Sequence, residues 1–202
     1  RGDGDDVTSV SARTVLRHEE DEANVQIEFA GEIFTPIASG ALYWPARDTL
    51  LVADLHLKKL SSYAARGSLL PPYDTGLTLR RLERDLHQTG AGQVIALGDS
   101  FHRDEGSSTL LEADRLRLMG LLGRTRWTWI AANHDPAPHL LGGLCTDRLQ
   151  LGPLTLVHEP SRGIPGLVAG HLHPAAHLAI NGRSTRRPCF VHDTSLMILP
   201  AY

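Results

Sequence analysis

Five short apolar runs in the sequence each end in residues that can bind a metal ion. The first run, residues 50–53, is followed by Asp54 and His56. Side chains two positions apart on an extended strand point to the same face, so one carboxylate and one imidazole converge there. That pair is half of a metal site. The other four runs end in similar side chains: Asp99, Asn133, His158, and the pair His171 and His173.

Together these residues offer two carboxylates, one amide and four imidazoles, with no thiolate. Mixed oxygen and nitrogen ligands suit Mn, Fe, Zn, Co or Ni better than Ca or Mg alone, and they differ from a cysteine-rich structural zinc site. Seven ligands exceed one tetrahedral ion but fit two ions that share a bridging carboxylate. Two ions about 3.5–4 Å apart can hold both the attacking and the leaving oxygen of a phosphoryl centre. The set therefore favours phosphoester hydrolysis.

Strands and helices alternate in the first half of the chain, and these elements must position the ligands. Apolar periodicity and turn residues predict the following order: strands at 25–29, 41–44 and 49–52, a helix from a cap at Asp74 or Thr75 to Gly90, a strand at 93–97, a helix at 108–122 with Leu111, Leu118 and Leu122 facing inward, and a strand at 126–131. From residue 149 the chain is predicted to be mainly β, with strands at 149–151, 154–157, 167–169, 177–180, 189–192 and 197–199.

This order predicts two sheets that pack face to face with helices outside, parallel in the first half and more antiparallel in the second. In open α/β sheets the ligand crevice lies beyond the carboxyl ends of the strands. Every one of the five metal-binding segments follows a predicted strand, so all of them can share one crevice.

Composition and charge limit the function further. A chain of 202 residues fits one domain, expected over 25–202, after an acidic and loosely ordered arm at 1–24. The net charge of −3 argues against broad, charge-driven binding of duplex nucleic acid but leaves a local basic patch open. No apolar run reaches the ~20 residues of a membrane helix. Cys145 and Cys189 are expected to be small buried residues of a cytoplasmic, reducing compartment, although a disulfide between them stays open.

The motifs occur in a characteristic order: Asp54-x-His56, Gly98-Asp99-x-x-His102, Asn133-His134-Asp135, His158, and Gly170-His171-x-His173. Spread over residues 50–173, this series resembles the calcineurin-like metallophosphoesterase superfamily. Further segments are similar to the bacterial DNA ligase-associated metallophosphoesterases: residues 42–46 leading into 50–57 with Lys59, Pro174 after the last histidine, and the closing segments 187–190 and 199–201.

The resemblance implies a four-layer α/β/β/α sandwich of two mixed sheets with flanking helices. It also implies two divalent ions, with Mn expected first and Fe, Zn, Co or Ni as alternatives. The implied ligands are Asp54, His56 and His173 for one ion, Asn133, His158 and His171 for the other, and Asp99 as the bridge between them.

The reaction follows from the same resemblance. Two dications lower the pKa of a bridging water, toward about 7 in the best-known zinc case, so that a hydroxide can attack phosphorus in line. His134, held by Asp135, would donate a proton to the leaving oxygen. The expected catalytic residues are His134, Asp99 and Asp135. The expected substrate contacts are Asn133, His134, His102, Lys59 and Arg103, with Lys58 and Lys59 balanced between a solvated helix start and a positive rim.

The resemblance favours a phosphodiesterase or nuclease that acts on DNA ends or nucleotides, linked to DNA repair beside an ATP-dependent ligase, a helicase and an exonuclease. Two alternatives stay open. One is a phosphomonoesterase or a nucleotide or phosphoprotein phosphatase at the same site. The other is a non-catalytic scaffold, which the complete ligand set disfavours.

Ala132 departs from the usual glycine before Asn133, at a tight turn. Arg186 and Arg187 are interpreted as a solvated charge pair.

Overall fold

The structure, a computed structural model, describes residues 25–57, 74–101, 110–131, 141–180 and 182–202. Its elements follow one another in this order: β1 (Ile27–Phe29), β2 (Glu32–Pro36), β3 (Leu42–Trp44), η1 (Pro45–Arg47), β4 (Thr49–Ala53), α2 (Thr75–Thr89), β5 (Gln93–Leu97), α3 (Glu112–Leu122), β6 (Arg126–Ile130), β7 (Leu144–Thr146), β8 (Arg148–Leu151), β9 (Leu154–Val157), β10 (Leu167–Ala169), β11 (Ala175–Ile180), β12 (Arg183–Pro188), β13 (Val191–His192) and β14 (Leu196–Ile198).

Two mixed sheets form the body of the protein. The first has seven strands in sequence order, β1 to β7, antiparallel from β1 to β4 and parallel from β4 to β7. The second has the order β13-β14-β10-β9-β8, in which β9, β10 and β14 are parallel. The second half of the chain is therefore less antiparallel than the sequence predicts, whereas the two packed mixed sheets confirm the predicted fold class.

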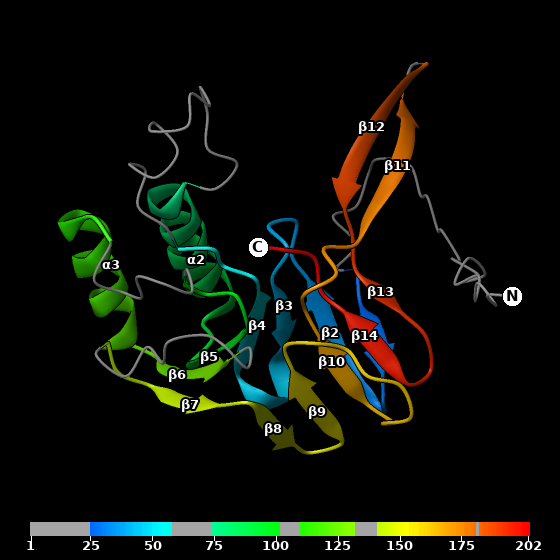
Figure 1. Ribbon diagram of the computed structural model, residues 1–202, viewed down its shortest axis with the longest axis horizontal. Coiled ribbons are helices and arrows are strands. Elements are labelled where there is room, and N and C mark those ends of the chain that lie inside the picture. Colours follow the sequence, from blue (N-terminus) through cyan, green and yellow to red (C-terminus); the bar gives the residue numbers. More distant parts are fainter. Residues whose placement is uncertain (1–24, 58–73, 102–109, 132–140, 181) are drawn as a thin grey trace, which may run out of the picture.

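Strand β4 shows how the layers are held together. All five of its residues are buried, and they alternate between two cores. Leu50 and Val52 face the core shared with α2 and α3, while Leu51 and Ala53 face the core between the two sheets. Figure 1 shows both helices on the side of the first sheet. A strand covered on both faces is apolar at every position, as the predicted run is.

The first helix matches its predicted caps. The Asp74 carboxylate accepts a hydrogen bond from the Leu77 amide at 3.1 Å, and Gly90 closes α2 with a φ of 69°. The second helix was predicted to bury Leu111, Leu118 and Leu122, and only Leu118 agrees. Leu111 precedes α3 and is 42% exposed, and Leu121 is buried in place of the half-buried Leu122. In the described range 110–131, α3 begins at Glu112, and residues 108–109 of the predicted helix lie outside the described residues.

The outer face of the second sheet carries a small cluster of Val157, Leu167 and Ala169 with Ile164 and Leu196. Within the described residues no helix covers this face, so the structure has one of the two helical layers that the resemblance implies. The predicted division into an arm at 1–24 and one domain at 25–202 stays a prediction, because residues 1–24 are not described.

The last four residues tie the two sheets together beside the strand ends. The Leu199 amide donates to the Ala169 carbonyl and the Tyr202 amide to the Ala53 carbonyl, both at 2.9 Å. The Tyr202 hydroxyl then donates to the buried Asp85 carboxylate of α2 at 2.7 Å. Residues 199–202 thus hold the ends of β4 and β10 against α2.

Two further expectations concern the cysteines and the membrane. Cys145 and Cys189 are both free and half-buried, so the disulfide that the sequence leaves open is not formed. In the described part of the chain, no helix combines the length and the apolar character needed to span a bilayer.

Candidate metal centre

The strand ends bring six of the seven predicted metal ligands into one region. Asp54 and His56 follow β4, Asp99 follows β5, His158 follows β9, and His171 and His173 follow β10. Backbone hydrogen bonds continue between these segments beyond the strands: the His56 amide donates to the Asp99 carbonyl at 2.9 Å, and the Gly170 amide to the His158 carbonyl at 3.1 Å. The two sheets therefore contribute their carboxyl ends to a single site, as predicted.

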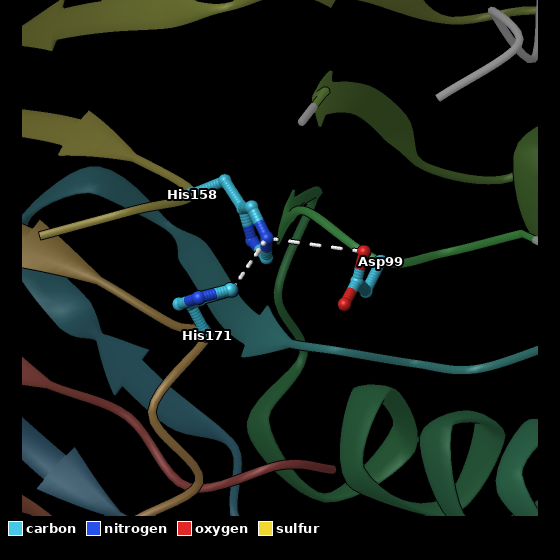
Figure 2. Close-up of side chains that lie close together, drawn as sticks. All are labelled: Asp99, His158 and His171. Carbon is cyan, nitrogen blue, oxygen red and sulfur yellow. Dashed lines mark hydrogen bonds and ion pairs between the residues drawn. The ribbon is translucent and has the colours of Figure 1, made fainter. Parts of the chain in front are cut away.

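Asp99, His158 and His171 form the tightest group. Their potential ligand atoms all lie within 4.8 Å of one another. The Nε2 atom of His158 is 3.1 Å from Nδ1 of His171 and 3.8 Å from Oδ1 of Asp99. Figure 2 shows the two imidazoles and the carboxylate converging on one space from three different segments. These are three of the residues that the resemblance assigns to one ion and the bridge.

Asp54, His56 and His173 form the adjoining group. Asp54 is fully buried, and its Oδ2 atom lies 3.4 Å from Nε2 of His173. The rings of His56 and His173 meet edge to face with centroids 5.3 Å apart. Oδ2 of Asp54 also accepts a hydrogen bond from the His171 amide at 2.9 Å, so it joins this group to the first.

Two buried polar atoms at the centre lack a hydrogen bond. Oδ1 of Asp54 and Nδ1 of His158 are buried and have no hydrogen-bond partner within the described ranges, and they lie 3.6 Å apart. Burying an ionisable or polar group without a partner is unfavourable. A cation bound among these atoms would satisfy them, and the oxygen and nitrogen donors are those that transition-metal dications prefer. The residues present therefore fit a divalent metal ion.

Electrostatics at the site follow from this burial. Desolvation raises the pKa of the Asp54 carboxyl to about 6, and Asp99 adds to the rise, whereas the His171 amide and His158 oppose it. Burial also lowers the pKa of the His173 imidazole. Both effects favour the neutral form of the side chain, whereas a nearby dication favours the charged form of a carboxylate.

The backbone at the ligands is strained. Among the described residues, seven other than glycine have a positive φ, and five of them are candidate ligands: Asp54 (50°), His56 (48°), Asp99 (32°), His171 (68°) and His173 (45°). Residues with a Cβ rarely adopt this region, and such strain concentrates at functional sites. Asp54 and His56 follow β4 with left-handed backbone, so the prediction that they converge by lying two apart on an extended strand is wrong in its reason.

Two glycines provide the space that the ligands need. A Cβ at Gly98 would overlap the His158 imidazole, and one at Gly170 would lie 3.0 Å from Oδ2 of Asp54. The sequence motifs contain both glycines, but their packing role was not predicted. The signal was the glycine directly before Asp99 and before His171.

A pocket of about 260 Å³ borders the centre beside His158. Its lining includes Arg148, Asp147, Glu159 and Ser161. None of these four was a sequence candidate, because none belongs to a metal-binding motif. Ala131 and Val157, at the ends of β6 and β9, complete the lining of the pocket, where a substrate group could enter.

The remaining predicted site residues lie outside the described ranges. They are the ligand Asn133, the catalytic candidates His134 and Asp135, and the substrate candidates Lys59, His102 and Arg103, together with Lys58 and Ala132. The roles assigned to them stay predictions.

Comparison with solved structures finds a strong likeness to a nuclease. The Pseudomonas putida nuclease MPE is 32% identical to this chain with a TM-score of 0.69, and the match covers 88% of this chain and 84% of the nuclease. A protein of unknown function from Aquifex aeolicus is 15% identical with a TM-score of 0.43, over 62% of this chain and 78% of that one, a likeness too weak to support an argument. No protein-family model and no curated protein matches the chain.

Proposed function

The chain belongs to the metallophosphoesterase family of that nuclease, and from this premise we propose that it is a metal-dependent phosphodiesterase that cleaves nucleic acid. The observation that carries the proposal is the convergence of Asp99, His158 and His171 within 4.8 Å beside the buried Asp54. Membership of the family supports hydrolysis of a phosphoester, and the nuclease relative supports nucleic acid as the substrate.

The proposed ligands divide into two groups. Asp99, His158 and His171 would hold one divalent ion, with Asn133 as their fourth member, and Asp54, His56 and His173 would hold a second. When bound, such ions supply Lewis acidity, which makes hydroxide available at neutral pH and offsets the charge of the phosphate. The orphaned oxygen of Asp54 and nitrogen of His158 support this assignment, because each lacks a partner within the described ranges.

The chain's own residues would perform the remaining steps. His134 would donate the proton that the leaving oxygen needs, and Asp135 would hold its imidazole in position. Both roles rest on the resemblance. The substrate would enter beside His158, where Arg148 lines the pocket together with Asp147 and Glu159.

Hydrolysis of an aryl phosphodiester tests the proposal most directly. The purified protein should hydrolyse bis(p-nitrophenyl) phosphate in Mn²⁺ and lose this activity in EDTA. Asp99→Ala should abolish turnover and reduce the metal content. Glu112→Ala is a matched control, because it removes an exposed carboxylate that pairs with Arg115 on α3, away from the site. No turnover with Mn, Fe, Co, Ni or Zn would refute the proposal.

Substrate comparison tests the finer part. We expect cleavage of a single-stranded oligodeoxynucleotide and slower hydrolysis of p-nitrophenyl phosphate, a monoester. Faster hydrolysis of the monoester would favour the phosphomonoesterase alternative instead. A role in DNA end processing beside an ATP-dependent ligase, a helicase and an exonuclease is part of the same proposal and rests on the resemblance alone.

A further inference from the structure

Strands β11 and β12 form a ribbon that belongs to neither sheet. They pair only with each other among the described strands, in register from Ala175 opposite Pro188 to Ile180 opposite Arg183. Figure 1 shows the ribbon extending away from the body of the protein. None of its described side chains is buried. A lone two-stranded ribbon is marginally stable by itself, so burial of a core does not explain this element.

The ribbon lies in a long stretch of the chain that contains no acidic residue. Between Glu159 and Asp193 the sequence has no acidic residue, but it has four arginines: Arg162, Arg183, Arg186 and Arg187. Three of them lie on β12, in a protein whose net charge is −3. All three are exposed, and in the described part of the chain none forms an ion pair. The positive charge is therefore available to a ligand.

The base of the ribbon adjoins the metal centre. Residue 173 is a candidate ligand, Pro174 follows it, and β11 begins at the next residue. The Cys189 amide donates to the Pro174 carbonyl at 3.1 Å and closes the base. The ribbon therefore starts two residues after a candidate ligand and returns to the same place.

The geometry suits an extended polyanion. Side chains alternate along a strand, so Arg183 and Arg187 share one face of β12 and Arg186 lies on the other with His177, its cross-strand neighbour. Six residues at about 3.4 Å each span about 20 Å. One strand of a duplex carries a phosphate about every 3.4 Å along its axis, so a ribbon of this length can meet several phosphates.

We propose that the β11–β12 ribbon is a nucleic-acid-binding arm, on which Arg183, Arg186 and Arg187 contact the phosphates of a polynucleotide that passes the metal centre. The inference rests on the proposed function, since it places the same substrate on a second surface. It replaces the interpretation of Arg186 and Arg187 as a solvated charge pair. It also gives a protein of negative net charge a place to bind nucleic acid, because three exposed arginines lie on one element.

Salt-dependent binding tests the arm. A fluorescent single-stranded 20-mer is titrated with the protein in EDTA at several KCl concentrations, so that binding is measured without cleavage. For the triple variant R183A/R186A/R187A, the slope of log Kd against log salt should fall by about 2, since each contact to a single strand contributes about 0.7. Binding at low salt should weaken about tenfold. The triple lysine variant keeps the charges and should retain most of the slope.

Arg126→Ala is the matched control. Arg126 is exposed at the start of β6, at the opposite end of the parallel strands from the ligands, and should leave the slope unchanged. Thermal unfolding checks that each variant is folded. A triple variant that binds with the unmodified slope, or an unmodified protein that does not bind the 20-mer, overturns the inference. Hydrolysis of the aryl diester by the unmodified protein tests the proposed function separately.

Discussion

Gly98→Ala should damage the metal centre through a single added methyl group. The added Cβ would overlap the His158 imidazole, with the ring Cε1 only 2.6 Å away. His158 is 4% exposed, so its ring cannot move aside without displacing buried neighbours. Gly90 offers a matched control. Its φ of 69° equals the 68° of Gly98 within a degree, and a Cβ there meets nothing within 4 Å.

Comparing Gly98→Ala with Gly90→Ala separates the cost of backbone strain from the effect of the clash with His158. An alanine in the left-handed region costs about 1–2 kcal/mol at either position. Only Gly98→Ala also displaces a proposed ligand, and even a change in the surroundings of a ligand weakens metal binding about 10–100-fold. At Mn²⁺ equal to 100 times the unmodified Kd, bound metal stabilises the unmodified protein by about 2.7 kcal/mol. If the Kd of the variant is 100-fold higher, the same formula leaves about 0.4 kcal/mol.

Thermal unfolding with and without Mn²⁺ measures this difference. At about 2–4 °C per kcal/mol for a protein of this size, Mn²⁺ should raise the Tm of the unmodified protein and of Gly90→Ala by about 5–11 °C. Gly98→Ala should gain only about 1–2 °C. An equal gain for the two variants would show that His158 does not help to hold the metal, and this outcome would refute the assignment.

Two further predictions concern His173, a candidate ligand, and Tyr202, which lies beside the site. Residue 173 has a φ of 45°, a conformation in which glycine is not strained but alanine is. In urea unfolding, His173→Gly should therefore be more stable than His173→Ala by about 1 kcal/mol, although glycine is usually the less stable of the two. A less stable glycine variant would contradict the strained conformation. Burial, followed by the Asp85 carboxylate, raises the pKa of the Tyr202 hydroxyl above its usual value of 10. Unfolding then releases the Tyr202 proton more readily, so stability holds below pH 10 and falls above it, and Tyr202→Phe should flatten this alkaline loss.

The parallel strands β4, β5 and β6 of the first sheet could be predicted from the sequence, because nearly all of their residues are buried. The apolar run of β4 and the capped helix α2 are examples in which local signals and tertiary burial agree. Strand β12 could not be predicted, because Arg183–Pro188 contains no large apolar residue and is held by its pairing with β11. Strands β2 and β7 were also missed. Ile33 of β2 and Leu144 of β7 are more than half exposed, so neither strand has a continuous buried apolar run like that of β4.

The meeting of the described candidate residues at the strand ends could be predicted, because it follows from the order of the motifs and the rule for parallel sheets. What the sequence could not supply was conformation. The left-handed backbone of Asp54 or His56 has no signature of its own, since these residue types favour other regions of φ and ψ. The net charge also gave no sign of the exposed positive ribbon, because it sums the arginines of the ribbon with the acidic residues elsewhere in the chain.

The backbone strain at the ligands explains why the ligand segments are held by backbone hydrogen bonds to neighbouring strands. Five left-handed residues at about 1–2 kcal/mol each would together cost on the order of 5–10 kcal/mol, which is comparable to the whole stability of a typical domain. The structure offsets this with fixed backbone partners: Leu97 accepts from the Asp54 amide at 3.4 Å, Asp99 from the His56 amide at 2.9 Å, and Ala53 from the Tyr202 amide at 2.9 Å. Bound metal would offset more of it, by satisfying Asp54 and His158 at the same time. The ligand loops are therefore expected to be the least stable part of the described fold without metal, and the part whose amide hydrogen exchange slows most when Mn²⁺ is added.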